Sequence, residues 1–223
     1  MTDFTTARAR MIDSQLRTED VSEPGILAAM GEVPRERFVP EKGAALAYID
    51  RSVPIEDPTT SGPARYLMRP AAFGKLIQLA EIGDGDKVLD VGAGTGYSAA
   101  VLARIAATVV ALENDAALVR TASALLEEFG AGKARAVQGP LEAGYAALAP
   151  YDVIVLEGSV EFVPQPLFDQ LAEGGRLVAV IGSGGSALGT LFTRTEDDIG
   201  RRPAFNSNAR PLPGFERPKS FVF

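Results

Sequence analysis

From residue 71 onward, short apolar runs alternate with stretches of helical spacing, and this alternation restricts the fold more than any other feature of the chain. The runs that we expect to be strands are residues 87–91, 108–112, 134–138, 152–156 and 176–181. The stretches that we expect to be helices are residues 73–82, 97–106, 115–129 and 166–171. Strands and helices that alternate in this way form βαβ units, which build a parallel sheet with helices on both faces. The sequence therefore predicts an α/β fold.

The first 70 residues have a different pattern. Residues 4–16 have helical spacing, and Ser22-Glu23-Pro24 is typical of a helix start, with a capping residue before a first-turn proline. Residues 53–70 are rich in proline and polar side chains, and a long irregular segment of this kind in a compact domain often serves function.

We therefore expect one domain over residues 1–223, divided into two parts. Residues 1–70 would form a helical annex and a substrate-side segment, and residues 71–223 the ligand-binding core. Residues 188–194 and 219–223 are expected to add two strands as a terminal hairpin, joined by a long polar connection. With these strands the core becomes a doubly wound, mostly parallel seven-stranded sheet.

The chain has no cysteine and no histidine among its 223 residues. This composition excludes disulfides, thiolate nucleophiles, Ser-His triads and nearly every zinc site, so no metal centre is predicted. The formal net charge of −7 and the absence of a clustered run of basic residues disfavour a nucleic-acid partner. No run approaches the length of a membrane span, and the beginning of the sequence lacks the layout of a signal peptide. We expect a cytoplasmic protein without a membrane partner.

A glycine-rich loop follows the first expected strand of the core. The loop reads Gly92-Ala93-Gly94-Thr95-Gly96, Asp90 lies just before it, and Glu113 closes the next expected strand. Glycines at the carboxyl end of a parallel strand let a ligand approach the backbone closely. Glu113 is near the position expected for the acid that binds ribose hydroxyls. The pattern predicts a nucleotide-type ligand.

The loop spacing distinguishes between nucleotide ligands. The dinucleotide fingerprint requires Gly or Ala where this chain has Tyr97, and no Gly-Lys-Ser/Thr follows, which excludes a phosphate-binding P-loop. Asp90 offers a carboxylate for the ammonium of an amino-acid end. S-adenosylmethionine is therefore the predicted cofactor, and NAD is the alternative.

Several segments resemble the protein-L-isoaspartate (D-aspartate) O-methyltransferases. Residues 88–97 are similar to that family's first motif, and residues 33–40 and 47–50 to its N-terminal segment. Residues 150–154 and 170–178 resemble its later strands. The resemblance implies a Rossmann-like class I methyltransferase fold, S-adenosylmethionine as cofactor, and methylation of the carboxyl groups of damaged aspartyl residues in proteins or peptides. The predicted cofactor-binding residues are Asp90, Gly92, Ala93, Gly94, Thr95, Gly96, Glu113, Asn114, Gly139, Pro140, Leu141, Leu156 and Glu157.

The substrate side departs from the family pattern. The family usually carries Gly-Gln-Thr-Ile-Ser-x-Pro before the sheet, and its Ser is placed at the reaction centre. Here Met68 stands at the position of that Ser and Pro70 at that of the Pro. Gly139-Pro140-Leu141 replaces the family's Gly-Asp-Gly, and Glu157-Gly158-Ser159 replaces its Thr-Ala-Ala.

Residues of the 53–70 segment are the candidates for acceptor capture. Arg65 or Arg69 is expected to pair with the acceptor carboxylate, Met68 to pack against the cofactor, and Thr59, Thr60 and Ser61 to offer further donors. Methyl transfer to a carboxylate needs no general base, because the nucleophile is already ionised at neutral pH, so a chain without histidine can perform it. Two alternatives stay open: a cofactor-binding protein that has lost isoaspartyl catalysis, and a methyltransferase for another acceptor.

Overall fold

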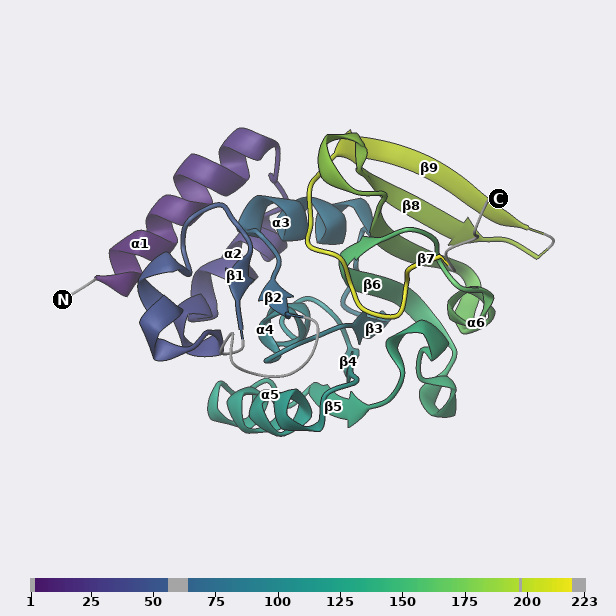
Figure 1. Ribbon diagram of the computed structural model, residues 1–223, viewed down its shortest axis with the longest axis horizontal. Coiled ribbons are helices and arrows are strands. Elements are labelled where there is room, and N and C mark those ends of the chain that lie inside the picture. Colours follow the sequence, from purple (N-terminus) through teal and green to yellow (C-terminus); the bar gives the residue numbers. More distant parts are fainter. Residues whose placement is uncertain (1–2, 56–63, 197, 218–223) are drawn as a thin grey trace, which may run out of the picture.

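The computed structural model describes residues 3–55, 64–196 and 198–217. Its centre is a seven-stranded sheet with the order β5-β4-β3-β6-β7-β8-β9 (Figure 1). Strands β3 to β7 are parallel, and β8 and β9 join the edge antiparallel. The strand bounds are β3 Lys87–Val91, β4 Thr108–Glu113, β5 Ala134–Gln138, β6 Tyr151–Val160, β7 Leu171–Ile181, β8 Leu188–Arg194 and β9 Ile199–Asn206. The predicted α/β fold with a mostly parallel sheet is confirmed.

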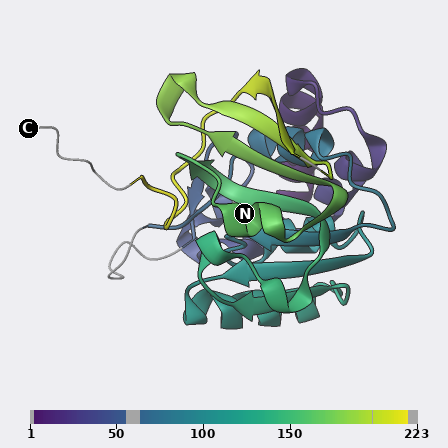
Figure 2. The same ribbon diagram turned by 90° about the vertical axis from the view of Figure 1, so that its right-hand side faces the viewer.

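Alternate residues of the central strands enter two different cores. In β3, Val88 packs in one buried cluster and Leu89 in the other, and in β6 Val155 and Leu156 divide in the same way. Because successive side chains of a strand point to opposite faces, both faces of the sheet are buried. Figure 2 shows helices on either side of the sheet.

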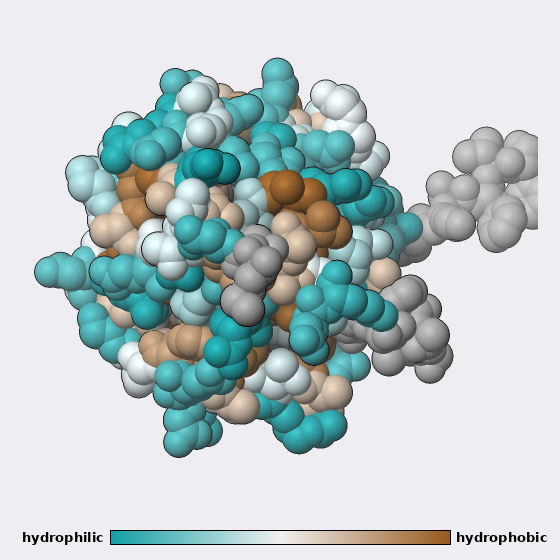
Figure 3. Space-filling model, turned by 90° about the vertical axis from the view of Figure 1, so that its left-hand side faces the viewer, coloured by the Kyte–Doolittle hydropathy of each residue, from teal (hydrophilic) through white to brown (hydrophobic). Residues whose placement is uncertain are grey.

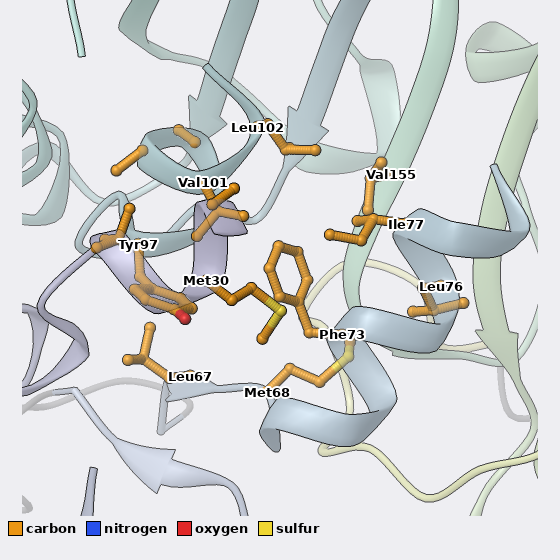
Figure 4. Close-up of a cluster of buried hydrophobic side chains, with 14 of the residues drawn as sticks. Met30, Leu67, Met68, Phe73, Leu76, Ile77, Tyr97, Val101, Leu102 and Val155 are labelled. Atoms are coloured by element: carbon orange, nitrogen blue, oxygen red, sulfur yellow. The ribbon is translucent and has the colours of Figure 1, made fainter. Parts of the chain in front are cut away.

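The first core lies between the sheet and helices α3 Pro70–Leu79, α4 Tyr97–Leu102 and α5 Ala116–Glu128. The second lies under α6 Gln165–Asp169 and the short 3₁₀ turn Leu141–Ala143. In the first core, Met30 of the annex meets Phe73 of α3 and Val101 of α4 (Figure 4). The annex and the sheet thus share one buried hydrophobic cluster.

The annex consists of α1 Phe4–Met11, a π-helical continuation over Ile12–Leu16, α2 Pro24–Glu32, and three 3₁₀ helices over Arg17–Glu19, Arg35–Phe38 and Glu41–Leu46. The side chain of Asp3 accepts the Thr6 amide and begins α1, and that of Glu23 accepts the Ile26 amide and begins α2. On the outer face of the annex, apolar residues are scattered among hydrophilic ones (Figure 3). The expected helices of residues 4–16 and after Pro24 are confirmed.

The edge of the sheet differs from the prediction. Strand β9 forms from residues 199–206, which the sequence assigned to a polar connection, and the expected strand over residues 219–223 lies outside the described residues. β9 is an exposed edge strand with arginines and a proline, so its sequence lacks an apolar signal. Within residues 53–70, β1 Val53–Pro54 and β2 Tyr66–Leu67 pair as a small antiparallel ladder. In the described part of the chain, no helix is both long and apolar enough to cross a membrane.

Candidate active site

The site lies where the winding of the sheet reverses. After β3 the chain builds β4 and β5 on one side, and it then returns to place β6 on the other side of β3. Asp90 and Val91 of β3 are in register with Val155 and Leu156 of β6. Ligands of open α/β sheets bind at the carboxyl ends of strands at such a reversal.

The glycine loop after β3 has a backbone that side chains would obstruct. Gly92, Gly94 and Gly96 all have positive φ, of 83°, 57° and 93°. A Cβ at Gly92 would lie 2.5 Å from the Leu212 side chain, and one at Gly94 would lie 2.5 Å from that of Ile55. The loop therefore exposes bare backbone to close neighbours, and in this structure the side chains of Ile55, the residue after β1, and of Leu212 in the C-terminal segment cover it.

Glu113 at the end of β4 is 1% exposed and organises the loop. Its Oε2 accepts the amide of Gly94 at 2.9 Å, and its Oε1 accepts that of Asn114 at 2.8 Å. The guanidinium of Arg65, from the residue before β2, donates to both oxygens, with Nη1–Oε1 at 2.6 Å and Nη2–Oε2 at 2.8 Å. Arg65 Nη2 also donates to the Gly92 carbonyl at 3.2 Å. Both oxygens of Glu113, the predicted ribose-binding acid, thus accept hydrogen bonds from Arg65, which the sequence predicts to bind the acceptor carboxylate.

Asp90 is fully buried at the end of β3. Its Oδ2 accepts the hydroxyl of Ser98 at 2.6 Å, whereas its Oδ1 has no hydrogen-bond partner among residues 3–55, 64–196 and 198–217. Burial raises the pKa of Asp90 to about 7, the nearby Glu113 charge adds to the rise, and the Ser98 hydrogen bond opposes it. A buried carboxylate with a free oxygen is suited to receive an ammonium group.

A small cavity of about 10 Å³ lies beside Asp90 and below the loop. Its walls include Arg35, Met68, Gly92, Tyr97, Ser98 and Glu157. Glu157 Oε1 is buried without a hydrogen-bond partner. Burial raises the pKa of Glu157, the Asp90 charge raises it further, and Arg35 opposes the rise. Glu157 therefore holds its proton more strongly than an exposed glutamate does.

Arg35 is a site residue that sequence reasoning missed. It is 1% exposed and donates from Nε to the Ala47 carbonyl at 2.7 Å and from Nη2 to the Met68 carbonyl at 2.6 Å. Its guanidinium lies over the Tyr97 ring, 4.7 Å from the centroid. Arg35 thereby fixes the backbone of the substrate-side segment to the annex. Its only sequence signal was its place within the 33–40 block.

Some predicted cofactor residues point their side chains elsewhere. Thr95 donates to the Phe38 carbonyl at 2.6 Å and so holds the loop to the annex. Leu141 and Leu156 are buried in the second core. Pro140 is exposed, and the Gly139 amide bonds to the Glu113 carbonyl at 3.1 Å. At these positions only the backbone is available to the site.

The residues predicted to bind the acceptor do not lie together in the structure. Asn114 Oδ1 accepts from Arg65 at 3.3 Å, so Arg65 belongs to the cofactor side. Met68 is 5% exposed in the core (Figure 4), and Arg69 pairs with Asp50 at 3.1 Å in an open groove. The remaining candidates of this segment, Thr59, Thr60 and Ser61, lie outside the described residues.

Comparison with known proteins shows the family to which a chain with this site belongs. The model of the protein-L-isoaspartate(D-aspartate) O-methyltransferase family matches residues 7–203. The chain belongs to this family. The methyltransferase match covers the annex as well as the sheet, so it extends well beyond the glycine loop.

Individual members of the methyltransferase family are similar over most of their length. Protein-L-isoaspartate O-methyltransferase 1 of Rhodopseudomonas palustris is 40% identical over 200 residues, which are 89% of this chain and 79% of the relative. The protein-L-isoaspartate O-methyltransferase of Gloeobacter violaceus is 39% identical over 91% of this chain and 96% of its own. A solved structure of a protein-L-isoaspartate O-methyltransferase aligns with a TM-score of 0.80 at 26% identity, over 93% of this chain and 66% of that chain. The Rossmann-like class I methyltransferase fold is confirmed.

Proposed function

We propose that the chain is an S-adenosylmethionine-dependent methyltransferase that esterifies the carboxyl groups of isoaspartyl residues in proteins or peptides. The observation that carries the proposal is the arrangement of Asp90, the bare glycine loop and Glu113 at the reversal of the sheet, in a chain of this family. The names of the relatives supply the acceptor.

The residues of the site fit this cofactor. Asp90 Oδ1 is a buried acceptor without a partner and would receive the ammonium of the amino-acid end. Glu113 would receive the ribose hydroxyls, and the positive-φ glycines leave their backbone accessible to the cofactor. Gly139 and Pro140 would border the adenine with their backbone. For the cofactor to bind, Arg65 has to release Glu113, and Ile55 and Leu212 have to withdraw from the loop.

When bound, the cofactor supplies an electrophilic methyl group on a positively charged sulfur. An acceptor carboxylate oxygen would form the new bond to the methyl carbon while the carbon–sulfur bond breaks. The electron pair of the carbon–sulfur bond would stay on sulfur. No proton moves in this step, so the chain supplies alignment and exclusion of water rather than a base. The apolar wall formed by Leu67, Met68 and Phe73 would exclude water beside the reacting groups.

The charged residues around the wall would orient the acceptor. Arg69 pairs with Asp50 at 3.1 Å and lies 3.9 Å from Glu19, so an acceptor carboxylate would compete with these two acids for its guanidinium. Once released from Glu113, Arg65 would be free to pair with the acceptor carboxylate. Arg35 would hold the Met68 backbone in place through its hydrogen bond.

A second candidate function rests on Met68. Because a thioether replaces the hydroxyl that the family places at the reaction centre, the chain would bind the cofactor and have lost isoaspartyl catalysis, or it would use another acceptor. The proposed cytoplasmic location, and the absence of nucleic-acid and membrane partners, stay predictions of the sequence.

The experiment combines binding with transfer. Calorimetry with adenosylhomocysteine and with NAD compares the two cofactors, and labelled adenosylmethionine with an isoaspartyl peptide measures transfer. We expect binding of adenosylhomocysteine but not NAD, and methyl ester formation that the Asp90→Asn and Glu113→Gln variants lose. Cofactor binding without transfer to any isoaspartyl peptide would favour the second candidate.

A further inference from the structure

A polar groove of about 520 Å³ opens beside the candidate active site. Its walls come from five parts of the chain: residues 50–52 before β1, Arg69 after β2, Ser159 near the end of β6, Ser183 after the end of β7, and residues 208–211. The groove thus lies at the carboxyl edge of the sheet, where the substrates of open α/β folds bind.

The groove carries a local positive charge. In the part of the chain that the structure describes, its walls include Arg51, Arg69 and Arg210 against one carboxylate, Asp50, with Glu19 3.9 Å from Arg69, whereas the whole chain has a net charge of −7. Asp50 is already engaged, because it pairs with Arg69 at 3.1 Å and accepts the Ala71 amide at 3.1 Å. Among the described residues, neither Arg51 nor Arg210 has a carboxylate partner. Two exposed guanidinium groups are therefore available for anions.

Two pairs of residues link the groove to the small cavity below the glycine loop. The guanidinium of Arg210 lies 5.0 Å from the centre of the Tyr66 ring, and Tyr66 lines the cavity. Arg69 directly follows Met68, which also lines the cavity. An acceptor whose reactive carboxylate reaches the apolar wall at Met68 would therefore extend its neighbouring residues along the groove.

Backbone hydrogen bonds hold Arg210 in this position. Ser159 at the end of β6 donates its amide to the Arg210 carbonyl at 2.9 Å and accepts the Leu212 amide at 2.9 Å. The Ser159 hydroxyl donates to the Ala209 carbonyl at 3.1 Å. The segment runs beside β6 like an additional strand, so the backbone that carries Arg210 is fixed by the sheet.

We propose that this groove binds the polypeptide acceptor on either side of the methylated residue, and that Arg51 and Arg210 select acceptors with carboxylate side chains there. The proposal rests on the proposed function and adds a substrate preference to it. A groove of this volume exceeds the size of one carboxylate and accommodates a short stretch of chain. The negative charge of the rest of the protein favours a peptide over a nucleic acid, which needs a broad basic surface.

The test compares isoaspartyl peptides of equal length whose flanking residues are glutamates, glutamines or lysines. The proteins are the native chain, the Arg51→Gln/Arg210→Gln double variant, and an Arg120→Gln control that removes an exposed arginine on α5.

We expect the native chain to prefer the glutamate-flanked over the lysine-flanked peptide by about tenfold in kcat/KM, from two exposed ion pairs. The double variant should lose most of this preference, the control should keep it, and added salt should weaken it. An unchanged preference in the double variant, or none in the native chain, would overturn the proposal.

A binding measurement keeps the groove testable if the proposed function fails. Fluorescence anisotropy of a labelled glutamate-rich peptide that contains aspartate in place of isoaspartate, with adenosylhomocysteine present, reports on binding without turnover. We expect about tenfold weaker binding to the double variant than to the control. Equal binding to both proteins contradicts the groove, and tighter binding of a single-stranded oligonucleotide than of the peptide assigns it to nucleic acid instead. Lack of methylation with intact selective binding refutes only the proposed function.

Discussion

Arg65 donates to both carboxylate oxygens of Glu113, at 2.6 and 2.8 Å, although the two residues are 48 positions apart. Both side chains are almost fully buried, with exposures of 7% and 1%. Glu113 is also the residue that we expect to hold the ribose hydroxyls of the cofactor. Arg65 and the ribose therefore compete for the same two oxygens.

Replacing Arg65 by glutamine should raise the affinity for adenosylhomocysteine by about tenfold, because the ribose no longer displaces a buried ion pair. The free protein should become less stable by about 3–5 kcal/mol, since the buried Glu113 loses its charged partner. Calorimetry measures the affinity, and denaturant unfolding measures the free energy of unfolding. The Arg120→Gln variant should change neither quantity. Weaker binding by the Arg65 variant would mean that Arg65 contacts the cofactor rather than competing with it.

Cofactor binding should depend on pH through Asp90, whose pKa is raised from 3.8 to about 7 by burial. An ammonium group favours the ionised carboxylate, so the affinity for adenosylhomocysteine should rise between about pH 6 and pH 8, with release of a proton. In the free protein the native carboxyl keeps its proton to higher pH than the unfolded one. The Asp90 contribution to the free energy of unfolding should therefore fall as the pH rises from about 4 to about 7, and level off above.

Calorimetry in buffers of different ionisation enthalpy counts the released protons. The Asp90→Asn variant should release none and should show a flat pH profile of affinity. A native profile that is flat over the same range would contradict the role given to Asp90.

Replacing Met68 by serine should cost about 2–4 kcal/mol of unfolding free energy, because Met68 is 5% exposed and packs in the first core. We expect the turnover number on an isoaspartyl peptide to change by less than about threefold, since the native chain already aligns the acceptor without a hydroxyl there. Steady-state kinetics at a temperature well below both unfolding transitions checks this. A gain of about tenfold or more would instead indicate a native site that has lost its catalytic hydroxyl.

Replacing Arg35 by lysine should destabilise the protein by about 2–4 kcal/mol, because one ammonium cannot stack on Tyr97 and donate to two separate carbonyls. Arg37→Lys is the matched control, since Arg37 lies two residues away and pairs with Glu128 at the surface. The control should cost less than about 1 kcal/mol. Equal losses in thermal or denaturant unfolding would show that the buried hydrogen bonds of Arg35 contribute little.

The parallel core was predictable because its strands are short apolar runs buried on both faces, as in Val88–Val91 and Val153–Leu156. β9 was not, because an exposed edge strand such as Ile199–Asn206 needs no apolar residues. Local spacing predicted where the glycine loop, Asp90 and Glu113 lie, after or at the ends of β3 and β4, whereas their roles toward the cofactor stay predictions.

Local spacing did not predict which side chains contact the glycine loop and Glu113. The pairing of Arg65 with Glu113 and the position of Arg35 under Met68 depend on contacts between segments far apart in the chain. Leu141 follows β5 and Leu156 lies within β6, but turn geometry and strand alternation direct their side chains into the core.

The central claim is that the chain methylates isoaspartyl carboxyl groups. The most direct measurement is the initial rate of base-labile methyl ester formation on an isoaspartyl peptide and on the aspartyl peptide of the same sequence, with adenosylmethionine as donor. The account predicts ester on the isoaspartyl peptide only, inhibition by adenosylhomocysteine, and loss of the rate in Glu113→Gln. Equal rates on the two peptides, or no ester on either while adenosylhomocysteine still binds, would contradict it.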